Sequence, residues 1–134
     1  MRRQHSRYDL RHPTWVRVLL LGSDKELSLF RVHILEAAGM QVTYPETKHA
    51  AVNAILMGGF DVILISYTLS NQSAEELLEL AHQNCPKCPV IAISETGWED
   101  NRLKPDITIT ADQGPKGMLD AIAQAQRRSL RRVK

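Results

Sequence analysis

Short apolar runs alternate with longer amphipathic segments along the chain. The most continuous run, Val62 to Ile65, is rich in branched side chains and is bounded by Asp61 and Ser66. Such a run is typical of a strand buried on both faces of a parallel sheet. Similar but less continuous runs predict four other strands, at residues 16–21, 41–44, 89–93 and 107–110.

Helices are predicted between these strands. Ser23 and Ser73 each stand three residues before a glutamate, which is the spacing of a capping box, so each predicts a helix start. Two further helices are expected over residues 47–57 and 117–128. Helical spacing of apolar residues predicts the buried face of the first helix, Leu27, Phe30, Ile34 and Ala37/Ala38, and of the last, Met118, Leu119, Ile122 and Ala123.

This alternation predicts an α/β fold. We expect a doubly wound, five-stranded parallel sheet of flavodoxin-like type, with strand order 2-1-3-4-5 and right-handed crossovers. Only residues 95–106 separate the fourth strand from the fifth, so the fourth helix is predicted to be shortened or missing. Ligands bind at the carboxyl edge of such sheets, where Gly22-Ser23-Asp24, Ser66-Tyr67-Thr68 and Ser94-Glu95-Thr96 would form a hydroxyl-rich pocket.

The length of 134 residues suits one domain, which we place at residues 15–128. No apolar run approaches the roughly 18 residues of a transmembrane helix. The N-terminus lacks the apolar region of a secretory signal, so we expect a cytoplasmic protein without membrane contact.

Charge is concentrated at the two ends of the chain. Four arginines and one aspartate give residues 1–13 a net charge of +3, and residues 126–134 carry +5 with no acid. The total of +2 therefore leaves −6 for the remainder. We expect a basic arm at residues 1–14 and a basic tail at residues 129–134, around a mildly acidic domain.

The two cysteines form a single C-x-x-C pair, Cys85 and Cys88, with His82 three residues upstream. This set supplies at most three ligands, whereas a closed zinc site needs four. A redox C-x-x-C would open a helix after a strand, but this pair follows a helix and precedes a strand. We favour a structural loop and expect no metal and no cofactor, with a redox or metal role as the alternative.

The order and spacing of these segments resemble the receiver domains of two-component response regulators. The resemblance covers roughly residues 15–128 and rests on VRVLLLGSDKELSLFRVHILEAAGM, FDVILIS and PVIAIS. It implies the receiver fold and a role in phosphorelay signalling.

In an active receiver, two adjacent acids after the first strand hold magnesium, and an aspartate after the third accepts the phosphoryl group. The resemblance puts the acids at Gly22 and Ser23 and the acceptor at Ser66. Asp24 is an acid, but it is shifted by one residue.

Two more positions of the pattern can be compared. The hydroxyl residue that contacts the phosphoryl group falls on Ser94, which matches. The lysine after the fifth strand falls on Thr110 or Ala111, neither of which is a lysine. Because phosphotransfer requires a carboxylate nucleophile and magnesium, we interpret the domain as a degenerate pseudo-receiver that is not an enzyme.

Our first functional hypothesis is a stand-alone signalling module that acts through protein contacts. A histidine kinase or an output protein is the expected partner, and a homodimer is the alternative. The candidate interface residues are Trp98, Pro105, Arg127 and Arg131. Two rival hypotheses remain: a nucleic-acid-associated protein using the basic ends, which we do not favour, and a small flavodoxin-like enzyme.

Overall fold

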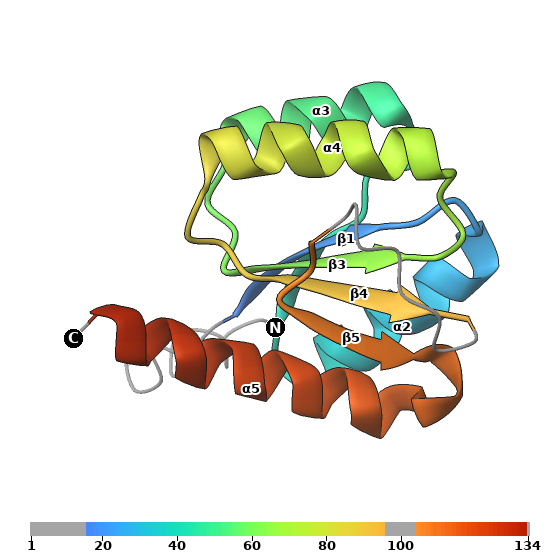
Figure 1. Cartoon of the computed structure of the whole chain (residues 1–134). Helices are drawn as coiled ribbons and strands as arrows, with labels where there is room; N and C mark the ends of the chain where they lie inside the picture. Colours follow the sequence, from blue (N-terminus) through green and yellow to red (C-terminus); the bar gives the residue numbers. More distant parts are fainter. Residues whose placement is uncertain (1–15, 96–103, 134) are drawn as a thin grey trace, which may run out of the picture.

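The computed structural model describes residues 16–95 and 104–133, and for residues 129–133 it describes the backbone only. Five parallel strands form one sheet in the order β2-β1-β3-β4-β5 (Figure 1), as the sequence predicted. The strands are β1 (Arg17–Leu21), β2 (Gln41–Thr43), β3 (Val62–Ser66), β4 (Val90–Ser94) and β5 (Ile107–Thr110).

Helices cover both faces of the sheet. One face carries α2 (Lys25–Ala37) and α5 (Gly114–Val133), and the other carries α3 (Lys48–Met57) and α4 (Asn71–Asn84) (Figure 1). A short 3₁₀ turn, η1 (Ala111–Gln113), joins β5 to α5. Residues 96–103, where the fourth helix of the predicted pattern would fall, lie outside the described residues. Among the described helices, none is both long and apolar enough to cross a membrane.

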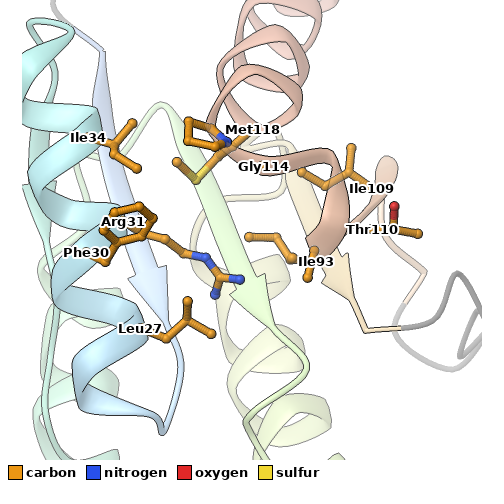
Figure 2. A pocket seen from close by; sticks show the side chains of 11 residues that line it. Leu27, Phe30, Arg31, Ile34, Ile93, Ile109, Thr110, Gly114 and Met118 are labelled. Carbon is orange, nitrogen blue, oxygen red and sulfur yellow. The ribbon is translucent and has the colours of Figure 1, made fainter.

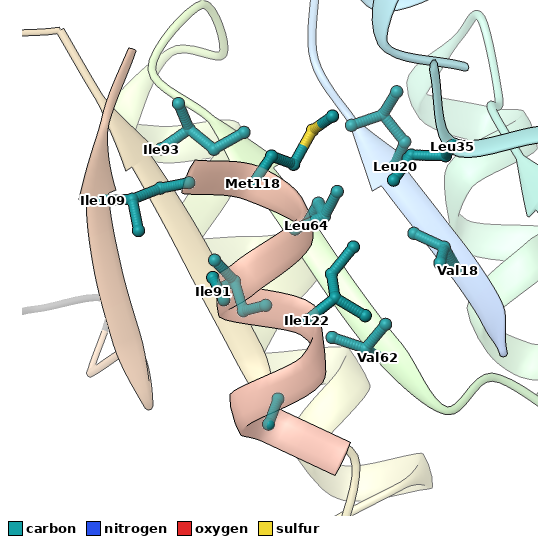
Figure 3. Packing of buried hydrophobic residues seen from close by; sticks show 12 residues of the cluster. Val18, Leu20, Leu35, Val62, Leu64, Ile91, Ile93, Ile109, Met118 and Ile122 are labelled. Carbon is teal, nitrogen blue, oxygen red and sulfur yellow. The ribbon is translucent and has the colours of Figure 1, made fainter. Parts of the chain in front are cut away.

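The strand β3 is the centre of the hydrophobic core. All five of its residues are buried, and successive side chains point to opposite faces of the sheet. Val62 and Leu64 pack with the α2 and α5 side (Figure 3), whereas Ile63 and Ile65 pack with the α3 and α4 side. This two-sided burial explains why the run contains no polar alternation.

Two helices begin at residues other than those predicted. The N-cap of α2 is Asp24, whose side chain accepts a hydrogen bond from the Leu27 amide, so the predicted start at Ser23 is wrong by one residue. The N-cap of α4 is Ser70, which accepts a hydrogen bond from the Ser73 amide. Asp24 thus caps α2 in place of Ser23, and Ser70 caps α4 in place of Ser73. Aspartate and serine are both good N-cap residues, so the capping-box spacing alone did not identify the right ones.

The buried face of α2 also differs from the prediction. Ser28, Arg31 and Leu35 are buried, whereas Phe30 is 56% exposed. These three positions follow helical spacing as well as the apolar set does. The helix α2 is rotated so that this more polar side packs against the sheet. A buried arginine therefore enters the space between α2 and the strands.

The last helix is longer than predicted. It begins at Gly114 instead of Gly117 and continues through residues 129–133 of the predicted tail. Pro115 suits the first turn, where its missing N–H has no intrahelical acceptor. Ala121 and Ala125 are buried in place of Ala123, which is exposed.

Candidate functional site

The ends of β1 and β3 meet at the carboxyl edge of the sheet. The Ser23 amide donates to Thr68 Oγ1 at 2.9 Å, and Thr68 Oγ1 donates to Ser66 Oγ at 3.2 Å. Gly22 lies against the same group, since a Cβ there would be 3.2 Å from Ser66 Cβ and 3.0 Å from Ser28 Oγ. The predicted neighbours Gly22, Ser23 and Ser66 are thus brought together, with Thr68 as the bridging hydroxyl.

Asp24 is the acid of this edge, and it already has a structural task. Its Oδ1 accepts a hydrogen bond from the Leu27 amide at 3.0 Å and caps α2. Its own backbone amide points toward Thr68 Oγ1 at 3.4 Å. The carboxylate is held at the helix start, and no second acid stands beside it in the chain segment Gly22 to Asp24.

Arg31 is the site residue that sequence reasoning missed. Its side chain reaches from α2 to β3, where Nη1 donates to Ser66 Oγ at 3.1 Å, and the residue is only 7% exposed. Burial lowers the pKa of Arg31, while electrostatic interactions with Tyr67 and Asp24 act in the opposite direction. A guanidinium remains protonated in proteins, so a fixed cation lies beside Ser66.

The available signal for Arg31 was its spacing. It stands three residues after Ser28 and four before Leu35, which places all three on one helix face. The more apolar set beginning at Leu27 outweighed this face because a charged residue is seldom assigned to a core.

Ser66 is placed as a hydrogen-bond acceptor. Its Oγ accepts from Arg31, from the Thr68 amide at 3.3 Å and from the Thr68 hydroxyl. A serine becomes a nucleophile when a neighbouring base takes its proton. Within the described part of the chain, no histidine or carboxylate hydrogen-bonds to Ser66, so its hydroxyl is not activated.

Ser94 and Ala111 lie further along the same edge. Ser94 ends β4 opposite Thr110, and its neighbour Ile93 pairs with Ser66. Ala111 opens η1 directly after β5 and lines a separate pocket between α2 and α5. The edge therefore presents Ser66 and Ser94 from adjacent strands, while Ala111 belongs to the neighbouring pocket.

The residues at this edge do not fit the magnesium ion of an active receiver. Magnesium is held by carboxylate oxygens in octahedral geometry. Among the described residues, no group of three or more His, Cys, Asp and Glu side chains is arranged to hold a metal ion. The positive charge of the buried Arg31, which lies beside Ser66, would also repel a magnesium ion.

The candidate interface residues are only partly described. Trp98 lies outside the described residues. Pro105 is half-buried, and Arg127 is exposed on α5. The neighbouring Arg128 donates from Nη1 to the Asp106 carbonyl at 3.2 Å, which ties α5 to the start of β5. Arg131 is part of α5, and only its backbone is described.

The C-x-x-C pair forms a turn at the opposite edge of the sheet. Cys85 is the C-cap of α4, and the Cys88 amide donates to the Cys85 carbonyl at 3.0 Å. Both thiols are free, and Cys88 Sγ donates to the Phe60 carbonyl at 3.4 Å. Burial raises the pKa of Cys88 well above its usual range, which keeps it a thiol. This geometry is that of a structural loop.

Solved receiver domains share this fold. A receiver domain protein from Methanospirillum hungatei JF-1 has 21% identity and a TM-score of 0.76, over 89% of this chain and 99% of that one. The receiver domain of a Francisella response regulator has 22% identity and a TM-score of 0.72, over 85% and 98%.

A third solved structure is instructive for the site. It is the receiver domain of a sensor histidine kinase from Pseudomonas aeruginosa PAO1, with a magnesium ion coordinated in its active-site cleft. Its identity is 16% and its TM-score 0.69, over 81% of this chain and 95% of that one. No protein-family model and no curated protein matches the chain. At these identities the likeness establishes the receiver-like fold.

Proposed function

We propose that this protein is a receiver-like signalling module that acts through protein contacts and does not accept an aspartyl phosphate. The observation that carries the proposal is the Arg31–Ser66 hydrogen bond of 3.1 Å. A neutral hydroxyl that accepts hydrogen bonds, with a buried cation beside it, cannot replace the carboxylate and the metal ion that phosphotransfer needs, and this supports the proposal.

The packing of Gly22 supports the same proposal. A side chain at this position would meet Ser28, Ser66 and Thr68 at 3.0–3.2 Å, which is tighter than ordinary contact. A side chain at Gly22 would therefore require these neighbours to shift, which supports the proposal that this position does not hold a metal-binding acid.

A signalling protein, either a histidine kinase or an output protein, is the partner we propose, with a second copy of the chain as the alternative. The exposed side of α5 near Arg127 and the segment around Pro105 adjoin each other through the Arg128–Asp106 hydrogen bond. A partner contacting both would bind a surface in which α5 is joined to the start of β5 by this hydrogen bond.

The test is an amide NMR titration of the full chain with magnesium, followed by beryllofluoride and acetyl phosphate. We expect no saturable shift for Ser23, Ser66 or Ser94 at millimolar magnesium. Sodium fluoride without beryllium is the matched control for beryllofluoride. Saturable shifts at these residues, with a phosphorylated mass after acetyl phosphate, would show that the site is active.

The extended α5 favours one second candidate, nucleic-acid association. Because the helix runs to Val133, Arg127 and Arg131 stand one turn apart on a continuous helix. Phosphate contacts from such a stripe would weaken steeply with salt. Binding of duplex DNA that falls with salt in the full chain and vanishes on removal of residues 127–134 would favour this candidate over the first.

A further inference from the structure

A pocket opens between α2 and α5 on the face of the sheet opposite α3 and α4. The space that is free of protein atoms is about 390 Å³, a figure that includes open solvent at the mouth, and the lining is mostly apolar (Figure 2). Leu27, Phe30 and Ile34 contribute one wall from α2, whereas Ile109 and Met118 contribute the other from β5 and α5. This pocket adjoins the hydroxyl cluster at Ser66, and Arg31 belongs to both.

Arg31 is the charged residue of this pocket. Its guanidinium extends from α2 toward the strands, between Leu27 and Ile93 in the view of Figure 2. The side chain is more than nine-tenths buried, and its one hydrogen bond to a described residue uses one of five N–H donors. No carboxylate of the described residues lies within salt-bridge distance of it.

Arg31 interacts electrostatically with Asp24 and bonds Ser66, but its buried guanidinium has no carboxylate of the described residues in direct contact, and this favours binding of an anion. Burying a charge without a partner is strongly unfavourable, and a guanidinium matches the oxygens of a carboxylate or phosphate. Binding sites for small molecules combine apolar walls with a few polar groups that fix orientation. This pocket has that composition, with a single positive charge at its inner end.

We propose that the pocket between α2 and α5 binds a small anionic amphiphile, with its carboxylate or phosphate head at Arg31 and a short apolar chain against Leu27, Ile34 and Met118. The inference goes beyond the proposed signalling role, because it identifies a chemical input for the module. Since Arg31 also bonds Ser66, an anion competing for the guanidinium would alter the carboxyl edge of the sheet.

The first experiment is a methyl NMR titration of the full chain with hexanoate, using 1-hexanol as the neutral probe of the same chain length. We expect saturable shifts of the Ile93, Ile109 and Met118 methyls, while Ile55 on the opposite face stays unchanged. Hexanol should bind more weakly, because it cannot pair with the guanidinium. Equal binding of both probes, or no saturable shift with hexanoate or hexyl phosphate, would overturn the proposal.

Matched variants test the role of the charge. Arg31→Met should weaken hexanoate binding by about tenfold, the loss expected for a charge-assisted hydrogen bond, and leave hexanol binding unchanged. Arg127→Met removes an exposed arginine of α5 and should leave both unchanged. Undiminished hexanoate affinity in Arg31→Met would contradict the proposal.

A second variant keeps the test decisive if Arg31→Met does not fold. Ala111→Phe fills the pocket from η1 without touching the guanidinium, and it should abolish binding of both probes. Retained binding in a folded Ala111→Phe variant would place the ligand elsewhere. Hexyl phosphate and inorganic phosphate then distinguish a phosphate head group from a carboxylate. Tighter binding of hexyl phosphate than of hexanoate supports the site and assigns it a phosphate head group. These outcomes are independent of the magnesium titration, so either proposal can fail alone.

Discussion

At the scale of single residues, the hydrogen bond between Arg31 and Ser66 has an asymmetric energetic role. Among the described residues, Ser66 Oγ is the hydrogen-bond acceptor of the buried Arg31 guanidinium. Removing an acceptor from a buried charged donor costs the desolvation of that donor, whereas removing both partners does not.

This asymmetry predicts a specific double-mutant cycle. Ser66→Ala should lower the free energy of unfolding by about 1–3 kcal/mol, since Arg31 is left without its acceptor. Adding Arg31→Met to Ser66→Ala should recover part of that loss, because the unpaired charge is gone. Urea unfolding followed by circular dichroism measures all four proteins. Strictly additive losses would mean that the two side chains do not interact.

A second prediction concerns Gly22 and Ser23, the two positions to which the receiver resemblance assigned the metal-binding acids. Gly22→Asp should destabilise the fold by about 1–3 kcal/mol, because its Cβ meets Ser28, Ser66 and Thr68 at 3.0–3.2 Å. Ser23→Asp is the matched control, since this residue is exposed. It should change stability by less than about 0.5 kcal/mol. Equal effects on the unfolding midpoint would show that crowding at Gly22 is unimportant.

At the scale of elements, the start of α2 depends on Asp24. Its carboxylate accepts from the Leu27 amide at 3.0 Å, which satisfies one of the free N–H groups of the first turn. The serine before it is exposed and gives the helix no cap.

Substitutions at these two residues separate the capping alternatives. Asp24→Ala should cost about 1 kcal/mol of unfolding free energy, and Asp24→Asn much less, because asparagine also caps helices well. Ser23→Ala should have little effect. Thermal unfolding of the three variants provides the comparison, and a larger loss from Ser23→Ala would restore the capping box that the sequence suggests.

The elements also show what sequence patterns can determine. The strands β1, β3 and β4 were predictable because each is a short apolar run, and β3 was the clearest because both of its faces are buried, whereas β2 and β5 are shorter and more polar. Helix starts were harder, since Ser70 and Ser73 are both good caps and local spacing does not choose between them. The rotation of α2 depends on tertiary contacts, which is why the sequence pattern did not identify Arg31 as a buried residue.

The candidate site was predictable to a similar degree. Gly22, Ser23 and Ser66 were expected together because parallel strands end at one edge, and the structure brings them together. The partner of Ser66 was not predictable, because it comes from a helix face that a pattern of polarity assigns to solvent.

At the scale of the whole molecule, the central strand β3 and the edge strand β2 differ in how firmly they are held in the sheet. β3 is buried throughout and pairs on both sides, whereas the three-residue β2 pairs with β1 alone. Native-state hydrogen exchange should therefore be slowest in β3, near the global limit, and much faster in β2. Equally slow exchange in β2 would indicate that its outer edge is covered by another chain.

The two hydrophobic clusters have a consequence for how this protein can diverge. Both clusters are built from strand and helix residues that exclude Gly22, Ser23, Ser66 and Ser94. Selection on folding therefore acts mainly on the residues of these clusters, and selection on the chemistry of the sheet edge acts on positions outside them, although Gly22 and Ser66 also affect stability through their own contacts. A lineage could exchange an acidic, metal-binding edge for a hydroxyl-rich one by a few point substitutions while its ancestry stayed visible in the backbone and faded from the sequence.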